Sequence, residues 1–484
     1  MDLPRIIQGG MGVAVSNWRL ARTVSAAGQL GVVSGTALDQ VLARRLQDGD
    51  PGGHMRYALS HFPFPEMAKR ILETYFIEGG KPAKAPYRKL PPHLKDCSRE
   101  LQELFIVSNF VEVFLARHGH SHPVGINFLE KIQVPHLASI YGAMLAGVDY
   151  ILMGAGIPMR IPGILDLYVN HEAATYPLYV SGATPELDTT MRFDPRDYME
   201  RELSALRRPK FLAIIASNTL AVTLLKKSNG RVDGFIIEGP TAGGHNAPPR
   251  GKLQLDETGA PIYGERDVVD LAKMRDLRVP FWLAGGYGSA EKLQEALNEG
   301  AAGIQVGTPF AFCEESGLRD DYRLPLLARA EAGLAKVKTD AWASPTGFPF
   351  KVAELEGTVS VAEKYQERPR ICDLGYLREA YQTAEGGIDF RCPSEPVTVY
   401  VAKGGKPEDT AGRKCICNGL LANIGHAQVR AGGRVEAGVV TAGDGLTEAA
   451  EFLPVTGLRY GARDVIEKLM AGVENDSLKE VVAA

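Results

Sequence analysis

Short apolar segments rich in β-branched residues alternate along most of the chain with longer segments of helical spacing. This alternation constrains the fold more than any other feature of the sequence. Strands and helices that alternate in this way build βαβ units and a parallel sheet, so an α/β fold is expected. The eight predicted strands are Arg5–Gln8, Leu30–Ser34, Pro123–Asn127, Tyr150–Met153, Phe211–Ala216, Gly234–Glu238, Phe281–Ala284 and Gly303–Val306.

Eight βα units favour a closed (β/α)8 TIM barrel, and a doubly wound open sheet is the alternative. Runs such as FLAIIA are apolar throughout, as expected for parallel strands that are buried on both faces. A ninth apolar run, Pro177–Val180, is placed in an excursion after the fourth strand. The predicted helices between the strands are Trp18–Ala27, His136–Ala146, Thr219–Lys227, Asp267–Met274 and Ala290–Asn298.

Two long segments lie outside this pattern. Residues 36–122 are too long for one crossover and have helical apolar spacing, so they are predicted to be a helical insertion over the barrel mouth. Residues 1–312 form the predicted barrel domain. Residues 313–484 form a C-terminal cap or extension, with one helix at about Tyr322–Lys336, and four of the six cysteines lie after residue 314.

Composition narrows the class of protein. The net charge of −4 gives no reason to expect nucleic acid or an anionic membrane as a partner. No apolar stretch of about 18 residues and no signal-peptide pattern is found, so a cytoplasmic protein is expected. Six cysteines in 484 residues do not indicate a secreted disulfide framework.

Glycines at the ends of the last two predicted strands indicate a phosphate site. LAGGYGS contains Gly285 and Gly286 and is followed by a helix with Ser289 at its N-cap, and GIQVGT ends in Gly307 and Thr308. In barrel enzymes the loops after the seventh and eighth strands commonly bind phosphate through backbone N–H groups. Ordinary strand-end turns are the alternative.

Polar residues near the ends of other strands suggest a site on the same rim. The sequence EGPTAGGH places His245 after the sixth strand, where a histidine can exchange protons near neutral pH. The first strand runs into Gly9-Gly10-Met11, and the third ends in GINF with Asn127. A water-exposed loop histidine and simple turn residues are the alternatives.

The motifs IIQGGMG, GINF, AGGH, LAGGYGS and GIQVGT, in this order, resemble the nitronate monooxygenase family, formerly called 2-nitropropane dioxygenases. That family includes FMN-dependent enoyl-ACP reductases. The resemblance covers residues 4–312 and implies an FMN-binding barrel whose active-site histidine is His245. The sequence departs from the usual turn, since Glu238 and Thr241 replace Gln and Glu before AGGH. The implied FMN contacts are Gly9, Gly10, Met11, Asn127, Gly285, Gly286, Gln305, Gly307 and Thr308, and the turn adds Glu238, Gly243 and Gly244 to the predicted cofactor-binding set.

Four cysteines in the C-terminal segment are candidate metal ligands. Cys372, Cys392, Cys415 and Cys417 lie within 46 residues and could bind zinc or an iron–sulfur cluster. Their spacing is not a recognised CxxC pattern. Buried structural thiols are the alternative.

The resemblance implies an FMN-dependent oxidoreductase that oxidises alkyl nitronates or similar carbanions with O2, with His245 as base or hydrogen-bonding partner. The alternative is an enoyl-thioester reductase that uses NAD(P)H or a ferredoxin and acts on a small-molecule or acyl-carrier-protein thioester. A non-catalytic barrel that binds a phosphorylated ligand is a third hypothesis. The sequence leaves the oligomeric state open.

Overall fold

Eight parallel strands form the centre of the computed structural model, which describes residues 3–473. Their order around the sheet is β1-β11-β10-β9-β8-β4-β3-β2. Each strand begins and ends within two residues of its predicted limits. The strands are β1 (Ile6–Gln8), β2 (Gly31–Ser34), β3 (Val124–Leu129), β4 (Tyr150–Gly154), β8 (Lys210–Ile215), β9 (Gly234–Glu238), β10 (Phe281–Ala284) and β11 (Gly303–Val306).

The sheet closes on itself between β1 and β2. The Gln8 N–H donates to the Leu30 carbonyl at 2.9 Å, and the Leu30 N–H donates to the Ile6 carbonyl at 3.1 Å. Ile7 and Leu30 form a parallel bridge between these bonds. The (β/α)8 barrel predicted from the sequence is therefore confirmed, and the doubly wound alternative is wrong.

Side chains alternate between the barrel interior and the surrounding helices, as the period of a strand requires. On β10, Trp282 packs inside with Ile236 and Leu212, whereas Phe281 and Leu283 belong to the outer core. The Trp282 indole N–H donates to the Pro4 carbonyl at 2.8 Å, which satisfies its one polar group. The interior is thus filled, and a ligand site is confined to the ends of the barrel.

Helices on the outside follow local capping signals. Asn17, Ser217 and Ser289 accept hydrogen bonds from the first turns of α1 (Trp18–Ala26), α8 (Asn218–Lys227) and α10 (Ala290–Asn298). Helix α6 (His136–Leu145) lies between β3 and β4 in the chain, and α7 (Ile161–Val169) follows β4 before the excursion.

The prediction of a helix at Asp267–Met274 was wrong at its start. Asp267 lies in a separate 3-10 turn, Glu265–Asp267. The Asp270 carboxylate accepts from the Lys273 N–H, so the helix α9 spans Leu271–Asp276. Asp270, not Asp267, is the N-cap residue.

The insertion of residues 36–122 is helical, with α2 (Leu38–Gln47), α3 (His54–Ser60), α4 (Pro65–Tyr75) and α5 (Arg99–Arg117). Helix α5 packs against α1 and α6 on the flank of the barrel, so it acts as the crossover between β2 and β3. Helix α2 reaches the C-terminal segment, where the Tyr376 hydroxyl donates to Asp39 and Arg44 donates to the His426 carbonyl.

The run Pro177–Val180 lies outside the barrel, as expected. It joins β5 (Ala174–Pro177) to β6 (Val180–Ser181). Strand β5 pairs with β7 (Thr190–Phe193), and β6 pairs with β14 (Glu379–Gln382) of the C-terminal segment.

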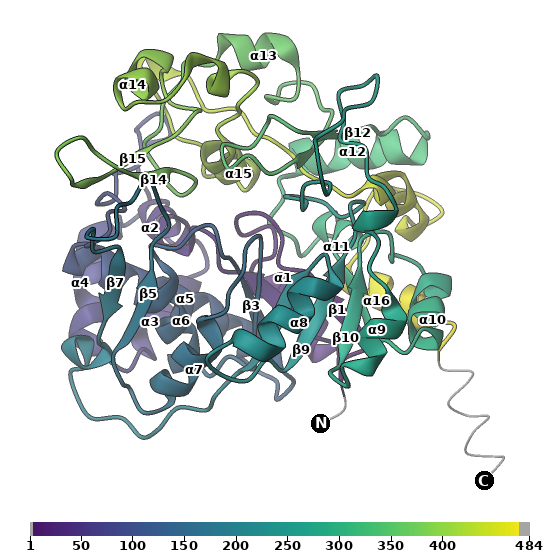
Figure 1. Cartoon of the computed structure of the whole chain (residues 1–484), viewed down its shortest axis with the longest axis horizontal. Helices are drawn as coiled ribbons and strands as arrows, with labels where there is room; N and C mark the ends of the chain where they lie inside the picture. Colours follow the sequence, from purple (N-terminus) through teal and green to yellow (C-terminus); the bar gives the residue numbers. More distant parts are fainter. Residues whose placement is uncertain (1–2, 474–484) are drawn as a thin grey trace.

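Most of the C-terminal segment lies across one end of the molecule, where it is drawn in green and yellow in Figure 1, whereas its last helix, α16 (Ala462–Met470), packs against α1 and α10 on the flank of the barrel. The predicted helix there, α12, ends at Glu331 rather than Lys336, because Gly333 with a φ of +69° stops it. One hydrophobic core includes Phe350 and Leu421 of this segment together with barrel residues such as Val306. Helix α11 (Thr308–Ala311) follows β11 directly. The elements of the C-terminal segment include α12 (Asp320–Glu331), β12 (Val337–Asp340), β13 (Phe350–Ala353), α13 (Ala362–Glu367), β14 (Glu379–Gln382), β15 (Ile388–Arg391), α14 (Val397–Ala402), α15 (Ile416–Asn423), the 3-10 segment η5 (Asp444–Phe452) and α16 (Ala462–Met470).

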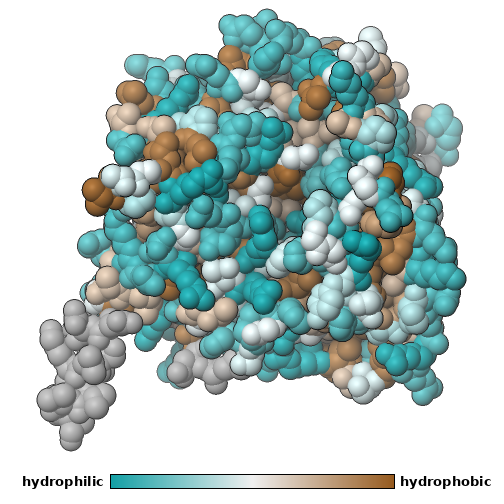
Figure 2. Space-filling view, turned by 180° about the vertical axis from the view of Figure 1, so that it is seen from behind, coloured by the Kyte–Doolittle hydropathy of each residue, from teal (hydrophilic) through white to brown (hydrophobic). Residues whose placement is uncertain are grey.

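Figure 2 shows one face that is mostly hydrophilic, with hydrophobic residues in separate small patches. Within residues 3–473, no helix is long and apolar enough to cross a membrane.

Candidate active site

A cavity of about 250 Å³ opens at the carboxyl ends of the barrel strands, between the strand-end loops and the C-terminal segment. Every residue predicted to bind the cofactor, and the predicted catalytic residue, lines it. The sequence-based prediction therefore named residues that the fold brings to one place. These residues are Gly9, Gly10, Met11, Asn127, Glu238, Gly243, Gly244, His245, Gly285, Gly286, Gln305, Gly307 and Thr308.

Two amide side chains in the cavity have unused hydrogen-bonding atoms. Asn127 Oδ1 and Gln305 Oε1 are buried and have no partner in the described residues, whereas Asn127 Nδ2 donates to the Gly10 carbonyl at 3.2 Å. Buried polar atoms in proteins are nearly always hydrogen-bonded, so orphaned acceptors in a cavity point to a ligand with donors. A flavin ring, with an N–H group at its edge, fits this arrangement.

The loop after β10 contains two of the glycines that were predicted to bind a phosphate, and both line the cavity. Gly285 and Gly286 have φ of +86° and +75°, a conformation that favours glycine. A Cβ at Gly285 would lie 2.9 Å from Thr241 Oγ1, so this position accepts no larger residue without a shift. Helix α10, capped by Ser289, begins directly after this loop. The pattern fits a phosphate held at a helix N-terminus.

His245 is held by the C-terminal segment. Its Nε2 lies 2.7 Å from Ser344 Oγ, and its ring packs edge-on against Phe350 with 4.8 Å between centroids. Burial, and next the positive charge of Lys131, lower the pKa of His245 to about 4. The imidazole is therefore neutral at physiological pH. With Nε2 engaged by Ser344, Nδ1 is the ring nitrogen left to bond a ligand.

Glu238 lies at the end of β9 and lines the same cavity. Among the described residues, its carboxyl group has no ion pair and no hydrogen bond. Burial without a compensating partner raises the pKa of Glu238 to about 7. The carboxyl group is therefore close to half protonated at neutral pH. It is able both to give and to take a proton there.

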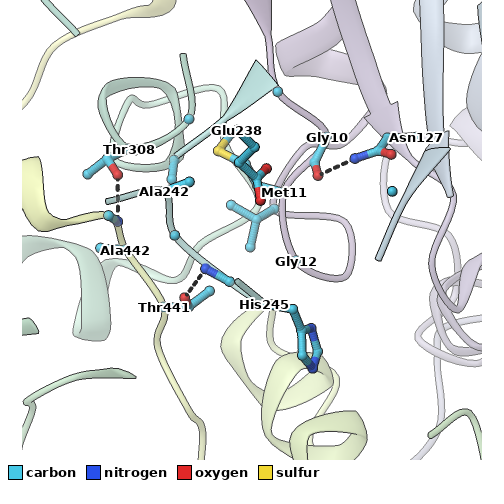
Figure 3. A pocket seen from close by; sticks show the side chains of 18 of the residues that line it. Gly10, Met11, Gly12, Asn127, Glu238, Ala242, His245, Thr308, Thr441 and Ala442 are labelled. Atoms are coloured by element: carbon cyan, nitrogen blue, oxygen red, sulfur yellow. Dashed lines mark hydrogen bonds between the residues drawn. The ribbon is translucent and has the colours of Figure 1, made fainter. Parts of the chain in front are cut away.

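Threonine side chains fasten the C-terminal segment to the site. The Gly244 N–H donates to Thr441 Oγ1 at 2.8 Å, and the Gly443 N–H donates to Thr308 Oγ1 at 2.9 Å. Figure 3 shows both bonds, together with Glu238 at the end of β9 and His245 in the segment that follows it. Strand periodicity ends before this segment, so periodicity gave no signal for its role. The cavity residues that sequence reasoning missed include Tyr376, Leu377, Ile416, Leu420, Asn423, Val440, Thr441, Ala442, Gly443 and Glu448.

The four C-terminal cysteines do not form a metal centre in this structure. Among residues 3–473, no three His, Cys, Asp or Glu residues lie where they could hold a metal ion together. Cys415 and Cys417 stand two positions apart at the start of α15, and residues with this spacing face different sides of a helix. Cys417 lines the central cavity, whereas Cys415 lines a separate pocket. The prediction of zinc or an iron–sulfur cluster at these residues is thus not supported.

The pKa values of three of these cysteine thiols are raised. The neighbouring Cys392 thiol, together with burial, raises the pKa of Cys372. Burial likewise raises the pKa of Cys415 and that of Cys417. Because a metal binds the thiolate, these neutral thiols agree with the alternative of buried structural cysteines.

Known proteins resemble this chain in sequence. Residues 194–344 match the family model for nitronate monooxygenase. A nitronate monooxygenase of Pseudomonas aeruginosa is 26% identical over 280 residues, which cover 58% of this chain and 72% of that protein. The (3aS,4S,5R,7aS)-5-hydroxy-7a-methyl-1-oxo-octahydro-1H-indene-4-carboxyl-CoA dehydrogenase of Rhodococcus jostii is 30% identical over 130 residues, 27% of this chain and 33% of that protein.

Solved structures are similar as well. FabK from Thermotoga maritima gives a TM-score of 0.47 at 16% identity, over 99% of this chain and 96% of that one. The enoyl reductase domain of MlnA from the macrolactin biosynthesis cluster of Bacillus amyloliquefaciens gives a TM-score of 0.46 at 13% identity, over 100% of this chain and 97% of that one.

Proposed function

Since the chain is an oxidoreductase related to the nitronate monooxygenases, we propose that it binds FMN in the central cavity and oxidises alkyl nitronates with O2. The observation that carries this proposal is the cavity itself. It combines a glycine loop suited to a phosphate, orphaned amide oxygens suited to a heterocycle, and a neutral histidine.

The residues that would hold FMN divide by chemistry. Backbone N–H groups at Gly285, Gly286 and Gly307 would bind its phosphate, because no side chain blocks their approach. Asn127 and Gln305 would accept hydrogen bonds from its ring. When bound, FMN supplies the electron acceptor that the protein side chains lack.

His245 would orient the substrate rather than remove a proton from carbon. A nitronate reaches the enzyme already deprotonated, so a base is not needed. A neutral imidazole with a pKa of about 4 is also a weak base at neutral pH. Through Nδ1 it can hydrogen-bond a nitro oxygen, while Ser344 fixes the plane of the ring.

Charges near the cavity are compatible with an anionic substrate. Lys131 is close enough to lower the pKa of His245, and its ammonium lies 4.5 Å from the centre of the Phe348 ring. Glu238 is the acid that lines the cavity near the ends of the barrel strands, and protonation would remove its repulsion of a nitronate.

A second function, reduction of an enoyl thioester, is favoured by the free carboxyl group of Glu238. In this reaction reduced FMN would supply a hydride for the β-carbon of the substrate, and Glu238 would supply a proton for the α-carbon. NAD(P)H or a ferredoxin would supply the electrons. A carboxyl group with a pKa of about 7 and no partner is a suitable proton donor. The similarity to a carboxyl-CoA dehydrogenase agrees with a thioester substrate.

One experiment separates the two functions. The protein is loaded with FMN, and its O2 consumption is measured with propane-2-nitronate as the substrate. In a second assay without O2, the oxidation of NADPH and of NADH is measured with a short enoyl-CoA. Nitronate-dependent O2 consumption that falls at least tenfold in His245→Ala and not in His122→Ala supports the first proposal. His122 is an exposed histidine and serves as the control. Enoyl-CoA reduction without nitronate oxidation supports the second, and failure to bind FMN rejects both.

A further inference from the structure

A second pocket lies in the C-terminal segment, next to α13 in the upper part of Figure 1, and has a volume of about 290 Å³. No Asp or Glu is among the described residues that line it. We call it the basic pocket, since four of its side chains are cationic. It is lined by Val359, Tyr365, Gln366, Arg368, Arg370, Arg413, Lys414 and Cys415.

Two of the arginines are fixed in place without a carboxylate partner. Arg413 donates to the carbonyl groups of Asp409, Trp342 and Ser344, the last at 2.6 Å. Arg370 donates to the carbonyls of Pro393 and Thr410. Backbone carbonyls position these guanidinium groups, and among the described residues neither forms an ion pair with a carboxylate. Asp409 and Asp340 act on Arg413 only from a longer distance. The pocket therefore carries two fixed guanidinium groups without a direct acid partner in the described part of the chain.

Arg368 adds a donor that is already out of water. Its side chain is 10% exposed, and Nε donates to Glu436 at 2.9 Å. Nη2 is buried and has no acceptor among the described residues. Glu436 is shared with Arg430, so it does not fully neutralise Arg368. A buried guanidinium donor without an acceptor is rare and indicates that a ligand supplies one.

We propose that the basic pocket binds a phosphate group. Several guanidinium donors around one space match the oxygens of a phosphate, which can accept from more than one of them. A single carboxylate would leave part of this charge unmatched, because Arg370 and Arg413 form no ion pair among the described residues, whereas Lys414 is paired with Asp340 at 3.0 Å and Arg368 with Glu436 at 2.9 Å. The volume exceeds that of one phosphate, so a pyrophosphate or a phosphate ester would fit.

The pocket is joined to the candidate active site through Ser344. Arg413 bonds the Ser344 carbonyl, while Ser344 Oγ bonds His245. On the other side, Cys415 lines the basic pocket, and Ile416 and Cys417 line the central cavity. The phosphate could belong to the far end of a CoA-type thioester that reacts in the cavity. This assignment rests on the proposed reductase function. It could also belong to a separate small phosphate compound.

The test measures binding directly and needs no turnover. FMN-loaded protein is titrated with sodium pyrophosphate in a calorimeter, against sodium chloride of the same ionic strength. One molecule is expected to bind per chain, and Arg370→Gln and Arg413→Lys are each expected to weaken binding at least fivefold. Arg463→Gln, at an exposed arginine of α16, is the control and should change binding less than twofold.

CoA and pantetheine distinguish the two sources of phosphate. A loss of CoA affinity in Arg413→Lys, with unchanged affinity for phosphate-free pantetheine, assigns the site to a thioester substrate. Weakened pyrophosphate binding with equal CoA and pantetheine affinity assigns it to a separate phosphate compound. The proposal is overturned if pyrophosphate does not bind above the chloride control. It is also overturned if Arg370→Gln and Arg413→Lys keep the melting temperature of the unaltered protein and bind pyrophosphate as tightly as that protein does. FMN content is measured on the same samples, so a failure of the cofactor proposal is recognised separately.

Discussion

His245 Nε2 and Ser344 Oγ lie 2.7 Å apart, although 99 residues separate them in the sequence. Their contact joins the loop after β9 to the C-terminal segment. A backbone bridge between His245 and Phe350 reinforces it. The orientation of the candidate catalytic ring is therefore set by a part of the chain that lies outside the predicted barrel domain.

Replacing Ser344 with alanine should slow turnover without loss of FMN. One hydrogen bond contributes about 1 kcal/mol, so the rate is expected to fall roughly fivefold to tenfold, less than in His245→Ala. Ser360→Ala is the matched control, because its hydroxyl bonds the Leu355 carbonyl instead. Steady-state rates at saturating substrate provide the measurement. A Ser344→Ala enzyme with the rate of the unaltered protein would show that this bond does not position His245.

Glu238 should make the stability of the FMN-free protein depend on pH. The pKa of Glu238 is about 7 in the fold, against an ordinary value of 4.5. Because the folded state holds the proton more tightly, the carboxyl group destabilises the fold increasingly as pH rises from 4.5 to 7. Above pH 7 the carboxyl group lowers the free energy of unfolding by its full amount, about 3 kcal/mol.

Urea unfolding of Glu238→Gln and of the unaltered protein at pH 5 and pH 8 tests this effect. From pH 5 to pH 8 the free energy of unfolding of the variant should rise by about 2–3 kcal/mol relative to that of the unaltered protein. His245, with its lowered pKa, destabilises the fold as pH falls from 6.5 to 4, but it is present in both proteins and cancels. Glu385→Gln, at an exposed acid, should show no gain. An equal pH dependence with and without Glu238 would mean that its carboxyl group is solvated or paired.

Gly285→Ala should weaken FMN binding. The new Cβ would lie 2.9 Å from Thr241 Oγ1 in the proposed phosphate loop, and the positive φ adds strain of about 1 kcal/mol. Gly333→Ala is the control, since Gly333 also has a positive φ but has open space around its Cβ position. Fluorescence titration with FMN should give at least a tenfold higher dissociation constant for Gly285→Ala. The claim fails if the two variants bind FMN equally.

The purified protein should not depend on a metal at the C-terminal cysteines. Cys415 and Cys417 face different pockets, and the thiols are held neutral by burial. Elemental analysis should find zinc and iron well below one atom per chain, and a chelator should leave the melting temperature unchanged. Stoichiometric metal that is lost in Cys372→Ser would contradict this structure of the segment.

Local patterns were sufficient to predict the barrel from the sequence. Strand β9 was predicted from a run of apolar β-branched residues between Asp233 and a glycine turn, and its limits agree with the structure. Asp267 misled the prediction of α9, because two candidate N-caps, Asp267 and Asp270, stand within one turn. The choice between them depends on hydrogen bonds that are made only in the fold.

The candidate site was predicted in part. Strand ends meet at one rim of a barrel, so Asn127, His245 and Gln305 could be placed together from their positions alone. Ser344 and Thr441 could not, since they lie in irregular segments whose path depends on long-range packing. The cysteine prediction counted ligands along the chain, whereas the start of α15 directs Cys415 and Cys417 to different sides.

The most direct test of the account is the flavin absorbance of FMN-loaded protein mixed with propane-2-nitronate in the absence of O2. We predict that absorbance near 450 nm (roughly the oxidised flavin band) falls on mixing, returns when O2 is admitted, and falls more slowly in His245→Ala. A protein that holds FMN at full occupancy, but whose absorbance does not change with the nitronate, would contradict the proposed oxidation.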